Sequence, residues 1–171
     1  MGMTTPFALR PATPADVETI VALIRELADY EKLAHAVQIT PAQLHRALFG
    51  DPVYARVVLG CVGDTVVGFA LFFSTFSTFL GQPGLYLEDL YVQPAYRGQG
   101  LGKQLLNHLA TQARQQGFGR VEWSVLNWNQ PAIEFYRRMG AVPMDEWTVY
   151  RLTGDALYPP SVAGQDSSGI I

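Results

Sequence analysis

A glycine-rich turn, between an expected strand and an expected helix, carries the clearest chemical signal in the sequence. It reads Arg97-Gly98-Gln99-Gly100-Leu101-Gly102-Lys103. Glycines let the backbone approach a ligand closely, and the first turn of a helix offers unpaired amide groups at the positive end of the helix dipole. Arg97 adds a guanidinium that suits phosphate oxygens. We therefore predict an anion site here, for a pyrophosphate or a similar group.

Two other phosphate-binding motifs differ from this turn in spacing. A dinucleotide fingerprint requires glycine three residues after Gly100, where the chain has Lys103. A Walker loop requires four residues between its glycines and a Ser or Thr after its lysine, whereas Gly98 and Gly102 enclose three and Gln104 follows the lysine. The remaining alternative is a tight turn without a ligand, which the strand–helix context disfavours.

The composition indicates one globular domain with a sizeable core. The 171 residues are 49% hydrophobic, and the formal net charge of −3 gives no reason to expect nucleic-acid binding. Apolar runs stop well short of a membrane span, so no membrane association is expected. Cys61, the one cysteine, lies in an apolar run typical of a buried residue. No metal cluster can be assembled from the cysteine and histidine spacing, and without an apparent secretory signal we expect a single cytoplasmic domain over residues 1–171.

Hydrophobic periodicity and turn residues predict a mixed α/β sheet flanked by helices. Thr13-Pro14 and Thr40-Pro41 mark helix starts, and Gly63-Asp64 marks a hairpin. The unit 85–126 should form a parallel, right-handed crossover. The expected elements are a strand at 7–10, helices from 14 and from 41, strands at 53–62 and 65–76, a loop at 77–84, a strand at 85–92, a helix from 101 ended by Gly117, a strand at 121–126, a helix at 130–139, a strand at 147–152 and a loose tail from 159 to 171.

Several stretches of the sequence together resemble a known superfamily. Beside the glycine-rich turn they are Arg10-Pro11-Ala12-Thr13, Leu27-Ala28-Asp29-Tyr30-Glu31, Tyr86-Leu87-Glu88-Asp89-Leu90-Tyr91-Val92 and Asn127-Trp128-Asn129-Gln130-Pro131-Ala132-Ile133-Glu134-Phe135-Tyr136. The set is similar to the GNAT N-acetyltransferases and, within them, to the diamine branch with its spermidine/spermine and thialysine acetyltransferases. The resemblance covers residues 7–152. It implies a mixed, mostly antiparallel sheet with a parallel, splayed central strand pair, acetyl-CoA as co-substrate, and a homodimer.

By this resemblance, acetyl-CoA is held where a strand ends and a helix begins. The splay leaves the backbone amides of Leu90, Tyr91 and Val92 free for the pantetheine arm and the thioester oxygen. Amides aimed at a developing oxyanion assist catalysis strongly. The turn from Arg97 to Lys103 holds the pyrophosphate. Asn129 bonds the CoA arm, caps its own helix, or does both.

Two side chains are expected to move protons. A primary amine is mostly protonated at neutral pH and must lose a proton before it can attack. The resemblance assigns this step to Glu88; the alternatives are that Glu88 only binds the cation, or that Asp89 takes the proton. Tyr136 is expected to contact the cofactor and to protonate the leaving thiolate. Its alternative is a tyrosine that only packs in the core with Phe135 and Met139.

The pocket for the amine is expected to combine aromatic and acidic side chains. By resemblance, the substrate-binding residues are Tyr30, Glu31, Glu88, Asp89 and Asp145.

One departure from the family pattern bears on the acceptor. The spermidine/spermine enzymes carry an acid and a tryptophan before the Leu-Glu-Asp strand, where this chain has Ser77 and Phe79. Losing a carboxylate weakens the binding of a long polycation more than that of a short zwitterion, so we expect a lysine-like amine such as thialysine. A polyamine, another acceptor such as a protein N-terminus or an antibiotic amine, and a non-catalytic acetyl-CoA-binding module remain alternatives. The joint presence of Glu88 and Tyr136 favours catalysis.

Overall fold

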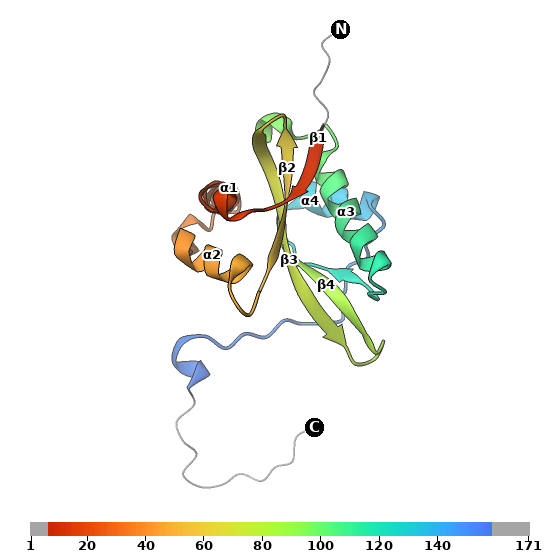
Figure 1. Cartoon of the computed structure of the whole chain (residues 1–171). Helices are drawn as coiled ribbons and strands as arrows, with labels where there is room; N and C mark the ends of the chain where they lie inside the picture. The colour runs from red at the N-terminus through yellow and green to blue at the C-terminus, as the bar shows by residue number, and fades with distance from the viewer. Residues whose placement is uncertain (1–6, 159–171) are drawn as a thin grey trace, which may run out of the picture.

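The computed structural model describes residues 7–158, which form a five-stranded sheet with helices on both faces (Figure 1). The strand order is β1-β2-β3-β4-β5, and neighbours are antiparallel except β4 and β5, which are parallel. This is the mixed, mostly antiparallel α/β fold that the sequence predicts. The elements are β1 (Phe7–Pro11), α1 (Val17–Tyr30), α2 (Pro41–Phe49), β2 (Arg56–Val62), β3 (Thr65–Ser77), β4 (Gln82–Val92), α3 (Leu101–Gln115), β5 (Val121–Glu122) and α4 (Gln130–Arg138).

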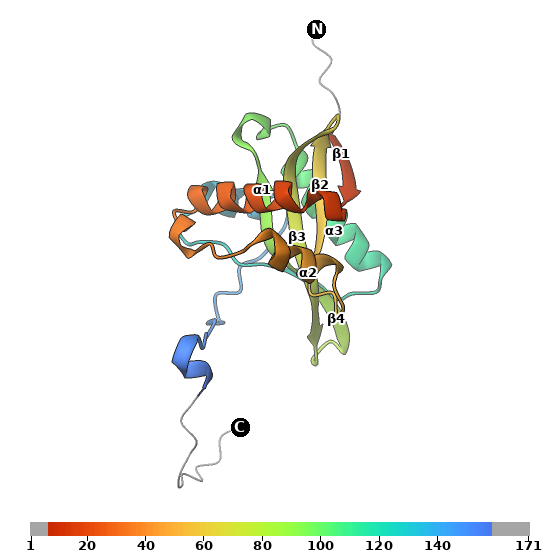
Figure 2. The same ribbon diagram turned by 60° about the vertical axis from the view of Figure 1, so that its left-hand side comes forward.

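Hydrophobic clusters fill both sides of the sheet and fix the helices that carry the site. On one side, α1 and α2 bury Ile20 and Leu44 together with Phe69 of β3 and with Cys61, which is buried as predicted. On the other side, α3 buries Leu105 in a second cluster, to which α4 adds partly buried side chains. Figure 2 shows α1 and α2 lying across the sheet. Burying one such aliphatic side chain contributes about 1.5–3 kcal/mol. None of the helices in the described part has the length and apolar character that a membrane crossing requires.

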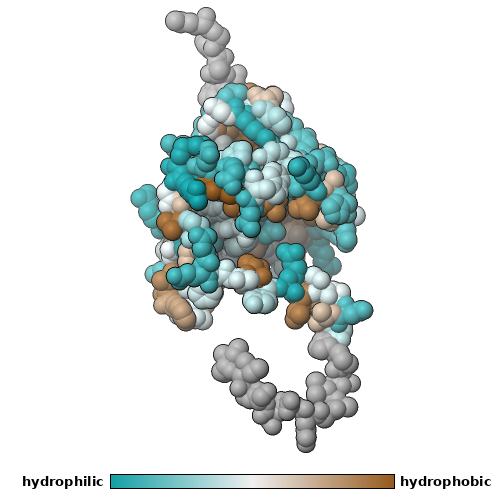
Figure 3. Space-filling model, turned by 180° about the vertical axis from the view of Figure 1, so that it is seen from behind, coloured by the Kyte–Doolittle hydropathy of each residue, from teal (hydrophilic) through white to brown (hydrophobic). Residues whose placement is uncertain are grey.

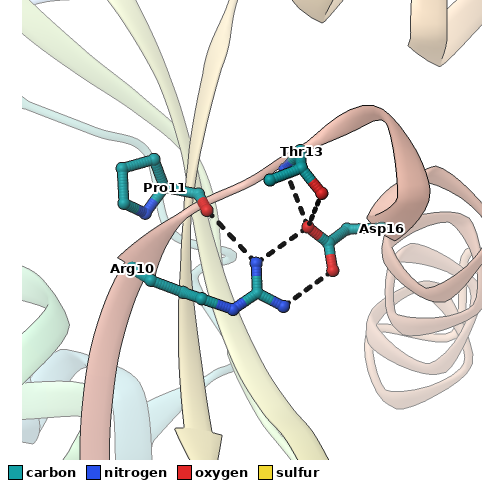
Figure 4. A network of polar contacts seen from close by, with 4 residues as sticks. All are labelled: Arg10, Pro11, Thr13 and Asp16. Carbon is teal, nitrogen blue, oxygen red and sulfur yellow. Dashed lines mark hydrogen bonds and ion pairs between the residues drawn. The ribbon is translucent and has the colours of Figure 1, made fainter. Parts of the chain in front are cut away.

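A polar network fixes the chain where it enters α1 (Figure 4). The Asp16 carboxylate accepts hydrogen bonds from both terminal nitrogens of Arg10, each at 2.8 Å. It also accepts from the backbone amide of Thr13 at 2.7 Å and from the hydroxyl of Thr13 at 2.8 Å. The hydrogen bonds from Arg10 are the main reason that the pKa of Asp16 lies well below its usual range. The helix predicted from Pro14 therefore begins as a short 3-10 turn and continues as α1.

Strands β4 and β5 pair at one end only. β5 has two residues, which pair with Leu85 and Tyr86 near the start of β4. From Leu87 to Val92, the only strand in the described structure that pairs with β4 is β3. The two strands therefore diverge, as the resemblance implied, and one edge of β4 is open. The strand expected over 121–126 is shorter than predicted. The parallel pair lies at the side of the sheet rather than at its centre, because no strand within residues 123–158 joins β5.

A bulge interrupts the pairing of β3 with β4. Leu71 pairs with Asp89 and the next residue, Phe72, pairs with Leu87, so that Glu88 has no partner in β3. A bulge leaves one residue out of the ladder and reverses the faces of the side chains that follow it. Before the bulge, β4 begins at Gln82 rather than at Leu85, because half of the region predicted as a loop over 77–84 continues the strands of the β3–β4 hairpin.

The C-terminal part of the chain is extended and exposed. The sequence predicts a strand at 147–152, but the structure has none there, and Trp147 and Tyr150 are 72% and 91% exposed. A strand forms only where a neighbour can pair with its backbone, and no strand of residues 7–158 lies beside this stretch. Figure 3 shows hydrophobic residues on the stretch that leads into the grey terminus. The tail predicted over 159–171 lies outside the described residues.

Candidate active site

The glycine-rich turn has the backbone that its sequence predicts. Gly98 and Gly100 have φ angles of 73° and 93°, in the left-handed region that glycine adopts without strain. Gly100 is the N-cap of α3, and the amide of Gln104 donates to its carbonyl at 3.0 Å. The amides of residues 101–103 precede this first helical bond and have no intrahelical acceptor. They present the positive end of α3 to a ligand.

Arg97 lies close to two tyrosine rings. Its Nε donates to the carbonyl of Val92 at 2.8 Å. Its guanidinium carbon lies 4.7 Å from the ring centroid of Tyr30 and 5.4 Å from that of Tyr91, both within range of a cation–π interaction. This use of Nε leaves most of the five N–H donors of the guanidinium for another acceptor. The remaining donors of Arg97 thus lie near the end of β4, where the phosphate ligand is predicted.

Two of the three predicted backbone amides face the open edge. The amide of Gln93 donates to Val67 at 2.9 Å, toward β3. Amide groups alternate in direction along a strand, so the amide of Tyr91 also faces β3, while those of Leu90 and Val92 face the gap beside β5. The Tyr91 side chain instead supports α1, because its hydroxyl donates to Glu26 at 3.1 Å.

Asn129 is buried at the start of α4 and joins two elements. It is 5% exposed, and its Oδ1 caps α4 by accepting from the amide of Ala132 at 3.3 Å, as predicted. The same oxygen accepts from the hydroxyl of Tyr30 at 3.1 Å. The Nδ2 group of Asn129 donates to no other group within residues 7–158, and no buried side-chain nitrogen there lacks a partner, so Nδ2 retains contact with solvent.

Tyr136 lies on α4 at the other border of the gap. Its ring is half-buried, 4.9 Å from the ring of Trp123 and 5.3 Å from that of Phe135. Burial, followed by the negative charge of Glu31, raises the pKa of Tyr136 to about 12. The hydroxyl is therefore protonated at neutral pH. The ring therefore packs in the core, and transfer of a proton from its hydroxyl stays a prediction.

The two adjacent carboxylates of β4 have different surroundings. Glu88, on the bulge, is exposed, whereas Asp89 is half-buried on the α1 side of the sheet, the face to which Tyr91 also belongs. Burial, followed by the charges of Glu88 and Glu31, raises the pKa of Asp89 to about 7. Burial also raises the pKa of Glu31 at the end of α1. The charge of Glu31 thus acts on both Asp89 and Tyr136 in this region of the protein.

Two residues used to infer the acceptor lie far from this region. Asp89 pairs with Leu71, and Ser77 is six residues further along β3. At a rise of about 3.3 Å per residue, the separation along the strand is about 20 Å. Ser77 is buried and accepts a hydrogen bond from the amide of Leu80 at 3.2 Å, while Phe79 is 94% exposed at the hairpin tip. Their positions therefore do not support contact with an amine that lies beside Asp89 of the same chain.

Asp145 is a further residue that the resemblance assigned to the amine pocket. It is exposed in the extended C-terminal segment and takes part in none of the side-chain hydrogen bonds or ion pairs found within residues 7–158. Among the same residues, no group of three or more His, Cys, Asp or Glu side chains is arranged to hold a metal ion.

Sequence reasoning missed two supporting residues. Glu26 receives the Tyr91 hydroxyl and the side-chain amide of Gln93, the latter at 3.2 and 3.3 Å, and so ties α1 to the end of β4. Trp123 packs on Tyr136. Glu26 could have been found from the sequence, because it is an acidic residue close to the apolar stripe of α1 and one turn before Tyr30. Trp123 follows β5 directly, and its partner is known only from the tertiary structure.

Comparison with known proteins identifies the family of this chain. The sequence matches the Acetyltransferase (GNAT) family over residues 20–141. The chain belongs to this family. It is therefore an acetyl-transferring enzyme, and acetyl-CoA is the co-substrate of GNAT acetyltransferases.

Individual relatives of this GNAT protein cover most of the chain. It is 37% identical over 160 residues to a thialysine N-epsilon-acetyltransferase of Bos taurus, covering 87% of this chain and 94% of the relative. It is 35% identical over 194 residues to an L-ornithine N5-acetyltransferase of Arabidopsis thaliana, covering 87% and 85%. An integron cassette protein of V. cholerae has a similar structure, with a TM-score of 0.76 and 27% identity over 92% of this chain and 97% of that one.

Proposed function

We propose that this enzyme transfers the acetyl group of acetyl-CoA to the side-chain amine of a lysine-like amino acid such as thialysine. The observation that carries the proposal is the half-buried carboxylate of Asp89 on β4, which the charge of Glu31 affects, on the strand that leads to a turn suited to pyrophosphate. Acidic side chains favour a cationic substrate. The names of the bovine and Arabidopsis relatives, which act on thialysine and ornithine, support an amino acid with a terminal amine.

The residues at the open edge fit acetyl-CoA, which supplies an activated acetyl group and a thiol leaving group. Gly98 to Lys103 and the guanidinium of Arg97 would hold the pyrophosphate, because their donors converge at the start of α3. The amides of Leu90 and Val92 would donate to the arm and to the carbonyl oxygen, and Asn129 Nδ2 provides a further donor. Tyr91 contributes its position in β4 rather than its amide.

A carboxylate must take a proton from the substrate ammonium, and two candidates remain. Glu88 was expected from the family resemblance. Asp89 is better placed for this role, because it is half-buried beside Glu31 and its pKa of about 7 is matched to proton exchange at neutral pH. We assign the proton-accepting role to Asp89 and the attraction of the cation to Glu88 and Glu31.

Tyr136 would return a proton to the leaving sulfur from its Oη. Its raised pKa keeps the proton in place before reaction, but a phenol with a pKa of about 12 is a weak donor to a thiolate, whose own pKa is about 8.5. The charge of Glu31 is the second cause of this raised value. An ammonium bound beside Glu31 offsets that charge, so binding of the amine should make Tyr136 a better proton donor.

The release of free CoA from acetyl-CoA tests the proposal against a panel of amines. The panel contains thialysine, lysine, ornithine, putrescine, spermidine, spermine and an aminoglycoside. We expect kcat/KM to be highest for thialysine or another short amino acid. A preference for spermidine would support acetyl transfer but contradict the proposal of a lysine-like acceptor. Binding of acetyl-CoA without turnover of any amine would instead indicate a protein acceptor or a binding module.

We further propose a homodimer, supported by the exposed apolar residues of the C-terminal segment. Trp147, Val149, Tyr150 and Leu152 are each at least 68% exposed, which is unusual for a run of residues in a monomer. Asp145 lies on this segment, so packing against a second copy is a route by which it would reach an amine site. Light scattering should give twice the mass of the chain, and Trp147→Ser with Tyr150→Ser should shift the mass toward that of a single chain. A wild-type mass of one chain would contradict the proposal.

A further inference from the structure

Tyr30 touches both cofactor-binding elements rather than the carboxylates of the amine region. It is the last residue of α1, and its ring lies under the guanidinium of Arg97, 4.7 Å from the guanidinium carbon. Its hydroxyl donates to Asn129 Oδ1 at 3.1 Å. A third contact is with Trp128, whose ring centroid is 6.2 Å away. One side chain thus connects α1, the glycine-rich turn and the start of α4.

These contacts constrain groups that otherwise rotate freely. An arginine side chain loses much rotamer freedom when it is ordered, and a ring beneath its guanidinium reduces the freedom that remains to be lost on binding. The hydroxyl of Tyr30 occupies Asn129 Oδ1 together with the Ala132 amide. Because Oδ1 is fixed from two sides, the amide plane of Asn129 is fixed too, and Nδ2 is directed away from both donors.

From these contacts we propose that Tyr30 is a positioning residue for the cofactor, which preorganises Arg97 and Asn129 for acetyl-CoA. This inference rests on the proposed acetyl-CoA site and changes the role expected for Tyr30, from contact with the amine to support of the cofactor. Tyr30 reaches no reacting atom itself. It acts through the guanidinium of Arg97 and the amide of Asn129, and therefore affects the dissociation constant for CoA more than the KM for the amine.

Two substitutions separate the contact of Tyr30 with Arg97 from its contact with Asn129. Tyr30→Phe keeps the ring under Arg97 and removes the hydrogen bond to Asn129, and should weaken CoA binding about fivefold. Tyr30→Leu removes both contacts and should weaken it about tenfold or more. Calorimetric titration with CoA alone, without any amine, measures the effect independently of turnover. Tyr54→Phe removes a hydroxyl from an exposed tyrosine of the α2–β2 connection and is the matched control, with no change expected.

A double substitution distinguishes positioning from general damage to the fold. In an Arg97→Gln background, Tyr30→Leu should weaken CoA binding by a smaller factor than in the wild type, because the contact with the guanidinium is already gone. Equal factors in both backgrounds, or a raised KM for the amine with unchanged CoA affinity, would overturn the inference. If the wild type itself binds no CoA, the proposed acetyl-CoA site fails and the inference fails with it. Thermal unfolding of each variant tests whether the folded state is retained.

Discussion

Replacing Asp89 by asparagine should stabilise the folded protein at neutral and alkaline pH while it removes activity. Folding raises the pKa of this carboxyl from its ordinary 3.8 to about 7, so the folded state disfavours the ionised form. Well below pH 4 the Asp89 carboxyl is protonated in both the folded and the unfolded state, so its raised pKa does not change the free energy of unfolding there. As the pH rises from 4 to 7, the unfolded chain releases the proton first, and the folded state loses stability. Asparagine carries no charge and avoids this loss.

The size of the effect follows from the two pKa values. The difference between 3.8 and about 7 corresponds to at most about 4 kcal/mol. Solvent around the half-buried group reduces it, and we expect about 2 kcal/mol in favour of the asparagine variant at pH 8. For a chain of this size, that raises Tm by about 4–8 °C. If Asp89 accepts the substrate proton, kcat/KM should also fall by about 100-fold or more.

The assay is thermal unfolding between pH 4 and pH 8, with CoA release measured on the same preparations. Glu88→Gln is the matched control, because it removes a neighbouring exposed carboxylate. Its Tm should change by no more than about 2 °C at any pH. A Tm difference between Asp89→Asn and the wild type that does not grow with pH would refute the argument from burial. Loss of activity in Glu88→Gln but not in Asp89→Asn would return the proton-accepting role to Glu88.

Three further changes test other parts of the structure. Tyr136→Phe should lower kcat by about 100-fold or more with CoA affinity within about twofold of wild type, as seen by steady-state kinetics and calorimetry; an unchanged kcat would leave the ring a packing role only. Asp16→Asn should lower the free energy of unfolding in urea by about 2 kcal/mol above pH 4. The pKa of Asp16 is depressed in the folded state, so this contribution to stability is lost as the pH falls through the acid range. A difference between variant and wild type that stays constant down to pH 2 would contradict the role of the Arg10–Asp16 pair. Gly100→Ala should cost about 1–2 kcal/mol and weaken CoA binding, because φ is 93° there, whereas Gly102→Ala, whose added Cβ meets only ordinary contacts, should cost less.

The parts of the site that are local in the chain could be predicted from the sequence. The turn from Arg97 to Lys103 has its glycines at the positions that need a left-handed backbone, and the start of α3 follows directly. The helix caps could also be predicted from the sequence. Thr40 before α2 and Asn129 before α4 each accept a hydrogen bond from the backbone amide three residues later in the chain.

The parts of the site that depend on tertiary neighbours could not be predicted from the sequence. Alternation along a strand assigns faces correctly only when the ladder is regular, and the bulge at Glu88 changes which of two adjacent carboxylates is buried. The role of Tyr30 depends on Asn129, 99 residues away in the chain. The apolar pattern at 147–152 predicts a strand, but sequence alone does not say which surface, in this chain or another, would pair with it.

The gap between β4 and β5 would link the stability of this protein to its ligand if acetyl-CoA binds there as proposed. The outer amides of β4 from Leu87 onward have no partner strand within residues 7–158, and a bound molecule would supply acceptors for them. A ligand held there at 100 times its dissociation constant adds about 2.7 kcal/mol to the free energy of unfolding. Resistance to heat and to proteolysis should therefore follow the concentration of acetyl-CoA, which makes the lifetime of the enzyme a readout of the acetyl groups available to it.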